Sequence, residues 1–342
     1  MLDKSTIDRF RSVIEENNKF ILTCHTNPDG DALGSTLGLR QVLLNMGKQA
    51  HVITPDLAPT MYSWINGFKT TTAYERAQAE CDVLIDDADV VFMMDYNTLS
   101  RIKSLGEKLK TFSKTKVLVD HHLDPDIDVD VFFSDPNEPA TCSYIFKILC
   151  EAGLKEYISI EAATNFYTGI MTDTGGLSYN SSSSDIYYVV ADLLNMGVDK
   201  PKVHDKIFNN KFMKQLRLLG FTLGHRMSWI PDLPLTVMAL SADDLERFNY
   251  NTGDTEGFVN YPLQVRNVVA NVLILERPDC VKISIRSKDE FPVNEFAAKY
   301  FGGGGHLNAA GCTYLGKFED AVRLYKENIK IFYTEWLAKQ GK

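Results

Sequence analysis

Hydrophobic and polar positions follow two periodicities along the first half of the chain. Short, nearly continuous apolar runs, which are typical of buried strands, lie at residues 20–24, 50–54, 89–94 and 116–119. Apolar residues at helical spacing predict helices over residues 1–20, 31–46, 141–151 and 159–172. Strands that alternate with helices favour an α/β fold, so we expect a doubly wound, mainly parallel sheet.

The pattern changes in the second half, after a break with turn chemistry at residues 197–201. Helical spacing predicts helices over residues 202–209, 212–225 and 293–300, and strands are predicted over residues 235–240, 268–276 and 281–286. These elements predict a second, smaller α/β domain. We therefore expect a first domain over residues 1–200, a helical connector over 201–226 and a second domain over 227–342.

Composition and charge narrow the class of protein. The 342 residues are 44% hydrophobic, which is enough to bury a core in each of two domains. The formal net charge of −9 argues against a long nucleic acid as partner, because such proteins usually carry a basic surface. The first residues lack the apolar segment of a signal peptide, and no apolar run approaches the roughly 20 residues that span a bilayer. Six scattered cysteines without a C-x-x-C pair agree with a cytoplasmic protein that contacts no membrane.

Acidic and imidazole side chains recur where the predicted strands and helices end. His25, Asp29 and Asp31 follow the first strand, Asp95 follows the third, and residues 120–122 (Asp-His-His) follow the fourth. Asp173 directly follows a predicted helix and is itself followed by Thr-Gly-Gly. Ligand sites in doubly wound sheets gather at the carboxyl ends of the strands, so we expect these side chains to converge.

Four carboxylates in one cleft would strongly oppose folding. Each like-charged pair about 4 Å apart costs roughly 4 kcal/mol at an effective dielectric of 20, against a typical stability of about 5–15 kcal/mol. Two divalent cations would neutralise the charge of Asp29, Asp31, Asp95 and Asp173, with His25 and His121 completing the ligands. A single D-x-D motif, such as Asp29 and Asp31, is more often a turn or a helix cap. Four motifs in the order H-x₃-D-x-D, D, D-H-H and D-T-G favour metal binding instead.

The ligand chemistry also selects the metal. Carboxylate and imidazole ligands without thiolate suit Mn²⁺ best, and Mg²⁺, Fe²⁺ or Co²⁺ also fit. Two such ions roughly 3.5–4 Å apart generate hydroxide and support in-line displacement at phosphorus. The pattern therefore predicts a two-metal phosphoesterase.

A glycine-rich segment in the second half is a candidate substrate site. Residues 302–305 are all glycine, so their backbone N–H groups could cup a phosphate, and His306 could add a hydrogen bond or stack on a base. Arg286 at a strand end could pair with a phosphate. A flexible surface loop is the alternative interpretation of the glycines. Arg101 is a weaker phosphate candidate, for which an exposed salt bridge is equally compatible.

The remaining histidines are not part of a motif with other candidate ligand or catalytic residues. We interpret His51, His204 and His225 as structural or surface residues.

The acidic motifs resemble those of the DHH phosphoesterase family. Residues 25–31 match its first motif, Asp95 its second, residues 120–122 the third, which names the family, and Asp173 its fourth. The second half is similar to the DHHA1 domain through Arg286-Ser287 and through residues 302–306 followed by 309–311. The resemblance covers nearly the whole chain. Its two-domain layout is most similar to the family's bifunctional oligoribonuclease and pAp phosphatase group.

The resemblance implies a ligand set and a role for each motif residue. One ion would be bound by His25, Asp29, Asp95 and Asp173, and the other by Asp31, Asp95, His121 and Asp173. Asp95 and Asp173 would bridge the ions, His122 would lie near the scissile phosphate, and Asp120 would support the imidazoles. Arg286, Ser287, Gly303, Gly304, Gly305 and His306 would bind substrate, together with Arg101.

The resemblance also implies the reaction. Two-metal-activated hydroxide would hydrolyse short oligoribonucleotides to nucleoside monophosphates and pAp to AMP, so the substrates are short oligonucleotides or nucleotide bisphosphates. A phosphodiesterase for cyclic dinucleotides or for linear pGpG or pApA is the nearest alternative, and a non-catalytic nucleotide sensor is an alternative of another class. The sequence leaves open whether the chain forms a homodimer.

Overall fold

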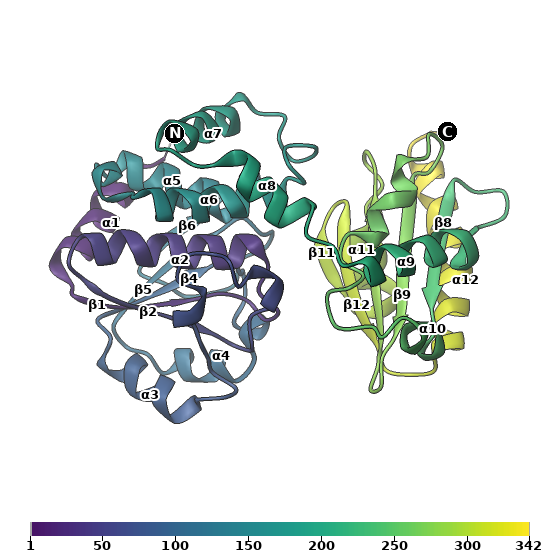
Figure 1. The fold of residues 1–342 in the computed structure, drawn as a ribbon, viewed down its shortest axis with the longest axis horizontal. Coiled ribbons are helices and arrows are strands. Elements are labelled where there is room, and N and C mark those ends of the chain that lie inside the picture. Colours follow the sequence, from purple (N-terminus) through teal and green to yellow (C-terminus); the bar gives the residue numbers. More distant parts are fainter. Residues whose placement is uncertain (1, 342) are drawn as a thin grey trace. The chain divides into compact units, whose positions relative to one another are not determined.

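The structure, a computed structural model, describes residues 2–341 and divides into two compact units between Asn210 and Lys211 (Figure 1). We call residues up to Asn210 the first unit and residues from Lys211 onward the second unit. No helix among the described residues is long and apolar enough to cross a bilayer.

The first unit is built on a parallel sheet with the strand order β3-β2-β1-β4-β5-β6. Its strands are β1 (Lys19–Thr23), β2 (Gln49–Thr54), β3 (Thr72–Ala73), β4 (Val90–Met94), β5 (Thr115–Asp120) and β6 (Val131–Ser134). The chain leaves β1 towards β2 and β3 and then returns to β4 on the other side of β1. The order therefore reverses between β1 and β4, the kind of position where doubly wound sheets bind ligands.

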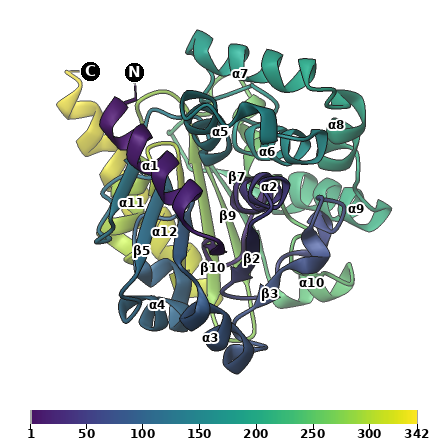
Figure 2. The ribbon, with the colours of Figure 1, turned by 90° about the vertical axis from the view of Figure 1, so that its left-hand side faces the viewer.

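Helices cover both faces of this sheet (Figures 1 and 2). They are α1 (Lys4–Glu16), α2 (Gly30–Asn45), α3 (Gln78–Asp87), α4 (Lys103–Lys110), α5 (Thr141–Glu151), α6 (Ile160–Asp173), α7 (Ser184–Asn195) and α8 (Lys200–Phe208), with 3₁₀ turns at Thr60–Tyr62, Phe68–Thr70, Leu99–Ile102 and Lys155–Tyr157. Alternating side chains of β1 enter two separate cores. Phe20 and Leu22 pack with α1, α2, α5 and α6, whereas Ile21 packs with α3 and α4.

The second unit is a mixed sheet with the strand order β11-β12-β10-β9-β8-β7. Its strands are β7 (Met227–Trp229), β8 (Leu235–Leu240), β9 (Ala270–Glu276), β10 (Val281–Ser287), β11 (Gly304–His306) and β12 (Ala309–Tyr314). Only β8 and β9 pair in parallel among these described strands.

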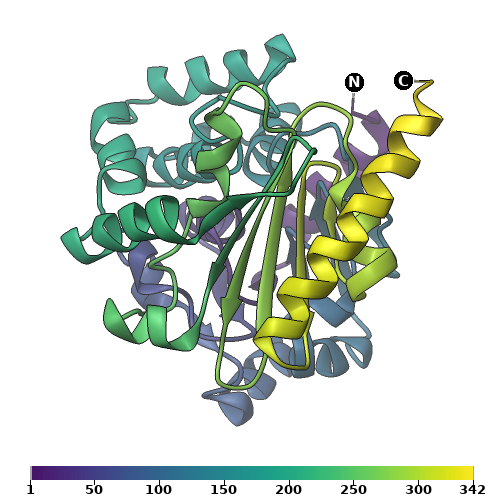
Figure 3. The same cartoon turned by 90° about the vertical axis from the view of Figure 1, so that its right-hand side faces the viewer.

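Helices lie on both faces of the second sheet as well. They are α9 (Met213–Phe221), α10 (Ala242–Arg247), α11 (Val293–Phe301) and α12 (Phe318–Lys339), with a π-helical turn at Thr222–Arg226 and a 3₁₀ segment at Phe258–Gln264. The long α12 lies across one face of the sheet, where it packs with α11 (Figure 3). Leu218 and Leu219 of α9 contribute to a second core on the opposite face.

The predicted fold class is confirmed, and most predicted elements are present with ends displaced by a few residues. The sequence pattern did not predict α3, α4, α7, α10 and α12, or the strands β3, β6, β7, β11 and β12. The predicted connector, residues 201–226, is shared between the units: α8 packs on α6, whereas the turn that follows α9 packs on β8.

The expectation of an open glycine loop at residues 302–305 is wrong in its local structure. Gly302 ends α11 in the left-handed region, with φ 60°, and Gly304 and Gly305 begin β11. Strand β11 pairs antiparallel with β12 across a tight turn. Part of the backbone of residues 302–305 is therefore paired in this hairpin and at the end of α11, instead of forming an open loop.

Candidate metal centre

The predicted metal ligands converge at the carboxyl ends of β1, β4 and β5. His25 lies two residues beyond β1, Asp95 directly follows β4, and Asp120 is the last residue of β5. Asp29 caps the N-terminus of α2, accepting hydrogen bonds from the backbone N–H groups of its first turn. The acidic groups therefore gather at the carboxyl ends of the strands, as expected from the sequence, and at the point where the strand order reverses.

Two of the side-chain groups with the dimensions of a metal site consist entirely of predicted metal ligands. His25, Asp29 and Asp95 form one, and Asp31, His121 and Asp173 form the other. Within each group the candidate ligand atoms lie within 4.8 Å of one another.

Asp95 faces both groups with different oxygens. Its Oδ2 lies 3.5 Å from Nε2 of His25, and its Oδ1 lies 3.5 Å from Nε2 of His121. Nε2 of His121 is also 3.4 Å from Oδ2 of Asp173. This geometry suits a carboxylate that bridges two cations, which is the role that the resemblance implies for Asp95.

The hydrogen bonds of the two histidines fix which ring nitrogen can bind a cation. Nδ1 of His25 lies 2.8 Å from the carbonyl oxygen of Thr26, and Nδ1 of His121 lies 3.0 Å from the carbonyl oxygen of Glu138. A carbonyl oxygen only accepts, so Nδ1 carries the proton in both rings. In a neutral ring, Nε2 then presents its lone pair to the carboxylates. Such an arrangement requires a positive charge between the donors, and a divalent cation fits it.

The shifted pKa values of the buried carboxyls also indicate that the centre needs positive charge. Burial, followed by the nearby charge of Asp95, raises the pKa of Asp31 to about 7. Burial and then Asp31 raise the pKa of Asp173 well above its ordinary value. Burial also acts to raise the pKa of Asp95, but hydrogen bonds from His121 and His25 lower it well below its ordinary value. Without metal, protons on the imidazoles and on some of the carboxyls must balance the charge.

His122 and Asp120 form a pair beside the two groups. Nδ1 of His122 donates to Oδ1 of Asp120 across 2.7 Å, and the Asp120 side chain is fully buried. The His122 ring meets the His121 ring edge-on, at a centroid distance of 4.9 Å. Asp120 therefore orients His122 directly.

The N-terminus of α5 supports the centre, which the sequence did not reveal. Oδ2 of Asp31 accepts the backbone N–H of Thr141 at 2.6 Å, and Oδ1 accepts that of Cys142 at 2.9 Å. The hydroxyl of Thr141 donates to Oδ1 of Asp95 at 3.0 Å. These donors hold the two carboxylates in fixed orientations, and the helix N-terminus favours their negative charge. These contacts join residues between 46 and 111 positions apart, so no local sequence pattern predicts them.

A second support, also missed, holds the loop that carries His25. Oδ1 of Asp56, at the end of β2, accepts the backbone N–H of Asn27 at 2.8 Å, while Oδ2 pairs with Nζ of Lys103 at 3.1 Å. The carbonyl oxygen of Arg101 accepts the N–H of Thr26 at 2.9 Å. Arg101 thus lies beside this loop, a position compatible with its predicted role as a phosphate contact.

Three of the residues predicted to bind substrate in the second unit, Arg286, Gly304 and His306, share one sheet face. Arg286 of β10 and His306 of β11 both lie opposite Ala309 of the intervening β12. Paired residues on neighbouring strands point to the same side, so Arg286 and His306 face the same way, roughly 10 Å apart across two strand spacings. The next row on this face pairs Gly304 with Gly311, which leaves a patch of bare backbone.

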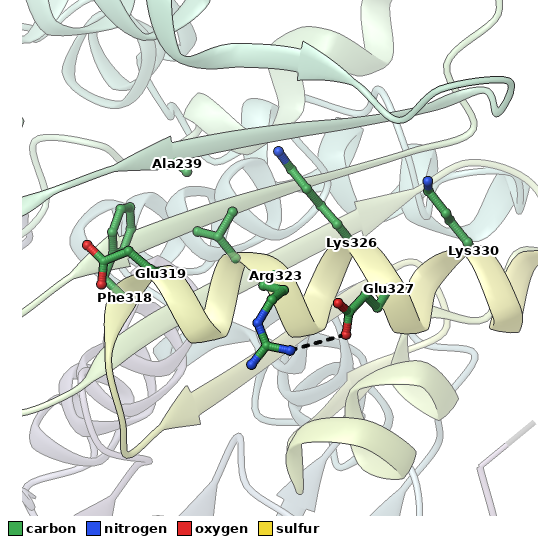
Figure 4. A pocket seen from close by; sticks show the side chains of 8 residues that line it. Ala239, Phe318, Glu319, Arg323, Lys326, Glu327 and Lys330 are labelled. Carbon is green, nitrogen blue, oxygen red and sulfur yellow. Dashed lines mark hydrogen bonds and ion pairs between the residues drawn. The ribbon is translucent and has the colours of Figure 1, made fainter.

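Ser287 has a structural role within this unit. Its hydroxyl donates to the carbonyl oxygen of Phe291 at 2.7 Å and accepts from Nδ2 of Asn308 at 2.9 Å. A separate groove of about 510 Å³ runs along α12, with Lys326 and Lys330 on its wall (Figure 4). None of the predicted substrate-binding residues lines this groove.

Comparison with known proteins places these features in one family. Residues 19–170 match the DHH family, N-terminal domain, and residues 233–331 match the DHHA1 domain. A crystal structure of an exopolyphosphatase-related protein from Bacteroides fragilis is 37% identical, covers 96% of this chain and 97% of its own, and superposes with a TM-score of 0.93. The chain belongs to the DHH family. The resemblance inferred from the motifs is therefore confirmed.

Curated relatives carry a more specific name. The bifunctional oligoribonuclease and PAP phosphatase NrnA of Thermus thermophilus is 28% identical, over 86% of this chain and 84% of that protein. The protein of the same name in Bacillus subtilis is 24% identical, over 89% of this chain and 91% of its own length. RecJ from Thermus thermophilus, in a crystal structure with Mn²⁺, shares the fold with a TM-score of 0.55 and 13% identity, over 96% of this chain and 55% of its own.

Proposed function

We propose that this chain is a metal-dependent phosphoesterase that hydrolyses short oligoribonucleotides to nucleoside monophosphates and pAp to AMP. The observation that carries the proposal is the pair of carboxylate and imidazole groups on either side of Asp95. The names of the curated relatives, which span most of the chain, support this choice of substrates.

Two divalent cations would occupy the two groups, with Mn²⁺ as the best match and Mg²⁺ or Co²⁺ as alternatives. His25 and Asp29 would belong to one ion, and Asp31 and His121 to the other, with Asp95 and Asp173 shared. The cations would supply a water activated as hydroxide and charge stabilisation for the phosphoryl oxygens.

The protein side chains perform the remaining tasks. Asp120 fixes the His122 ring through Nδ1, and Nε2 of His122 would contact an oxygen of the scissile phosphate. Arg101 would pair with a phosphate near the His25 loop. Thr141 and Cys142 keep Asp31 and Asp95 oriented while the charge on the phosphate changes.

The second unit would bind the part of the substrate that is not cleaved. Arg286 supplies a bidentate partner for a phosphate, and the bare backbone at Gly304 and Gly311 lets a flat base approach the sheet closely. His306 on the same face would stack on that base. Limited contact of this kind agrees with short substrates and with the net charge of −9.

The test is a substrate panel with purified protein and Mn²⁺ or Mg²⁺. The panel contains pAp, RNA from dimers to longer oligomers, pGpG, cyclic di-AMP and inorganic pyrophosphate. We expect release of AMP from pAp and of monophosphates from the short RNA, and faster turnover of pGpG or cyclic di-AMP would replace the proposed substrate class. Binding without turnover on the whole panel would favour a nucleotide sensor.

A single variant tests whether one site performs both reactions. Asp95→Ala removes the shared carboxylate, so both activities should fall to background together. Asp8→Ala, an exposed acid on α1, is the matched control and should keep both. Full turnover of either substrate by Asp95→Ala would exclude the shared site.

A further inference from the structure

The backbone that follows Asp173 has an unusual conformation. Gly175, Gly176 and Leu177 lie in succession in the left-handed region, with φ values of 54°, 69° and 67°. Such a conformation is unfavourable for a leucine and persists only when its surroundings hold it. Asp173 is the last residue of α6, so this turn fixes how the helix ends and where the carboxylate lies.

Two aromatic side chains of α8 pack against this turn, and a third, Tyr167 of α6, contacts one of them. A Cβ added at Gly176 would lie 3.4 Å from the ring of Phe208 and 3.9 Å from Cε1 of His204, so both rings of α8 cover its bare backbone. The rings of His204 and Phe208 lie against each other at a centroid distance of 5.4 Å. On the α6 side, the hydroxyl of Tyr167 lies 3.0 Å from Nε2 of His204.

The hydrogen bond between Tyr167 and His204 joins α6 to α8. Tyr167 is 1% exposed, and burial raises the pKa of its hydroxyl to about 12. Burial also lowers the pKa of His204. At neutral pH the hydroxyl is therefore protonated and the imidazole uncharged, so the hydroxyl can donate to Nε2.

We propose that Tyr167, His204 and Phe208 form a lock that holds the left-handed turn after Asp173 and thereby positions the Asp173 carboxylate for metal binding. The inference rests on the proposed function, because Asp173 is a metal ligand only if cations occupy the centre. Tyr167 and His204 are positioning residues, since they act on Asp173 through the turn at Gly176.

The lock predicts a specific pattern of metal affinity. Tyr167→Phe removes the donor and His204→Phe removes the acceptor, while both keep an aromatic ring. Each should weaken Mn²⁺ binding about five- to tenfold, which is the scale of one lost neutral hydrogen bond. The double variant should be no weaker than either single variant, because both remove the same bond. His204→Gln, whose side-chain oxygen can accept the tyrosine proton, should recover much of the affinity.

Mn²⁺ binding is measured by isothermal titration calorimetry on the full chain, with thermal unfolding in EDTA and pAp hydrolysis recorded beside it. His51→Phe is the matched control, an exposed histidine on β2, and should bind Mn²⁺ as the wild type does. A lower unfolding temperature for Tyr167→Phe or His204→Phe with unchanged Mn²⁺ affinity would overturn the lock and leave those residues purely structural. Wild-type protein that fails to bind Mn²⁺ would instead refute the proposed function, and the lock with it.

Discussion

Removal of the cations should make the stability of the first unit fall as the pH rises. Burial and Asp95 raise the pKa of Asp31 to about 7, above the ordinary 3.8, so ionising this carboxyl costs folding free energy as the pH rises through that range. Burial lowers the pKa of His25, but Asp95 and Asp29 outweigh it and raise that pKa from 6.5 to about 9. The stabilisation from protonated His25 is complete below its unfolded pKa and is lost as the pH rises towards 9.

The magnitude follows from the distance between the folded and unfolded pKa values. Each pH unit between them is worth about 1.4 kcal/mol, and Asp31 and His25 share the neighbour Asp95, so their effects overlap. We expect the free energy of unfolding of the first unit to fall by roughly 3–4 kcal/mol between about pH 5 and 8.5. For a domain of this size, that loss lowers the unfolding temperature by about 10 °C. The raised pKa of Asp173 acts in the same direction. The lowered pKa of Asp95 acts oppositely, but mainly below about pH 4.

Differential scanning calorimetry in EDTA across this pH range measures the effect. Mn²⁺ at about 100 times its dissociation constant should add roughly 2.7 kcal/mol and remove most of the pH dependence, because the cations replace the protons. Asp173→Asn should flatten the EDTA profile, whereas Asp8→Asn on the exposed face of α1 should not. An unfolding temperature that is constant or rises with pH in EDTA would refute the close packing of these carboxyls.

Three further changes test the supports of the centre and the second unit. Thr141→Val removes the hydroxyl that donates to Asp95 and should weaken Mn²⁺ binding about tenfold by calorimetry, with an unchanged circular dichroism spectrum. Gly305→Ala places a Cβ 2.2 Å from a facing carbonyl at φ 144°, so KM for short RNA should rise at least about tenfold while kcat changes less than about twofold in steady-state assays. Asp244→Asn should destabilise the second unit by about 1 kcal/mol at pH 7 in urea unfolding, because it breaks the paired hydrogen bonds from Arg226. Burial acts to raise the pKa of Asp244, but Arg226 lowers it below its ordinary value. The stability difference between the wild type and Asp244→Asn should therefore disappear as the pH falls below this lowered pKa, because Asp244 then becomes protonated.

The sequence predicted the sheet and the convergence of the acidic groups because both depend on local patterns. An apolar run such as 90–94 identifies a buried strand, and a polar residue directly after it, such as Asp95, lies at the strand's carboxyl end. In a doubly wound sheet those ends share one edge, so the order of motifs along the chain already implies one site. Which acid faces which imidazole does not follow from this argument, because it depends on side-chain directions.

The supports of the centre could not be predicted, because their signals are not local. Thr141 looks like an ordinary first residue of a helix, and only the folded chain shows that its N–H and hydroxyl meet Asp31 and Asp95. Likewise, nothing in the sequence marks Asp95 itself for the left-handed region, where it lies with φ 64°. Such a conformation commonly occurs at functional sites, where the surroundings offset its cost.

The glycine segment at residues 302–305 shows that residue type alone does not determine backbone conformation. Four successive glycines permit an open loop, but they also permit a left-handed helix end at Gly302 followed by an edge strand. The strand results because the neighbouring β12 offers a pairing edge, and because Gly303 and Gly305 lie where a Cβ would strike its backbone. Gly303 and Gly305 are thus required by close backbone approach, whereas Gly304 and Gly311 meet no neighbouring atom and leave the bare surface on the face of Arg286. A ligand at this face would therefore meet the paired backbone of a hairpin, with Arg286 and His306 on the same side.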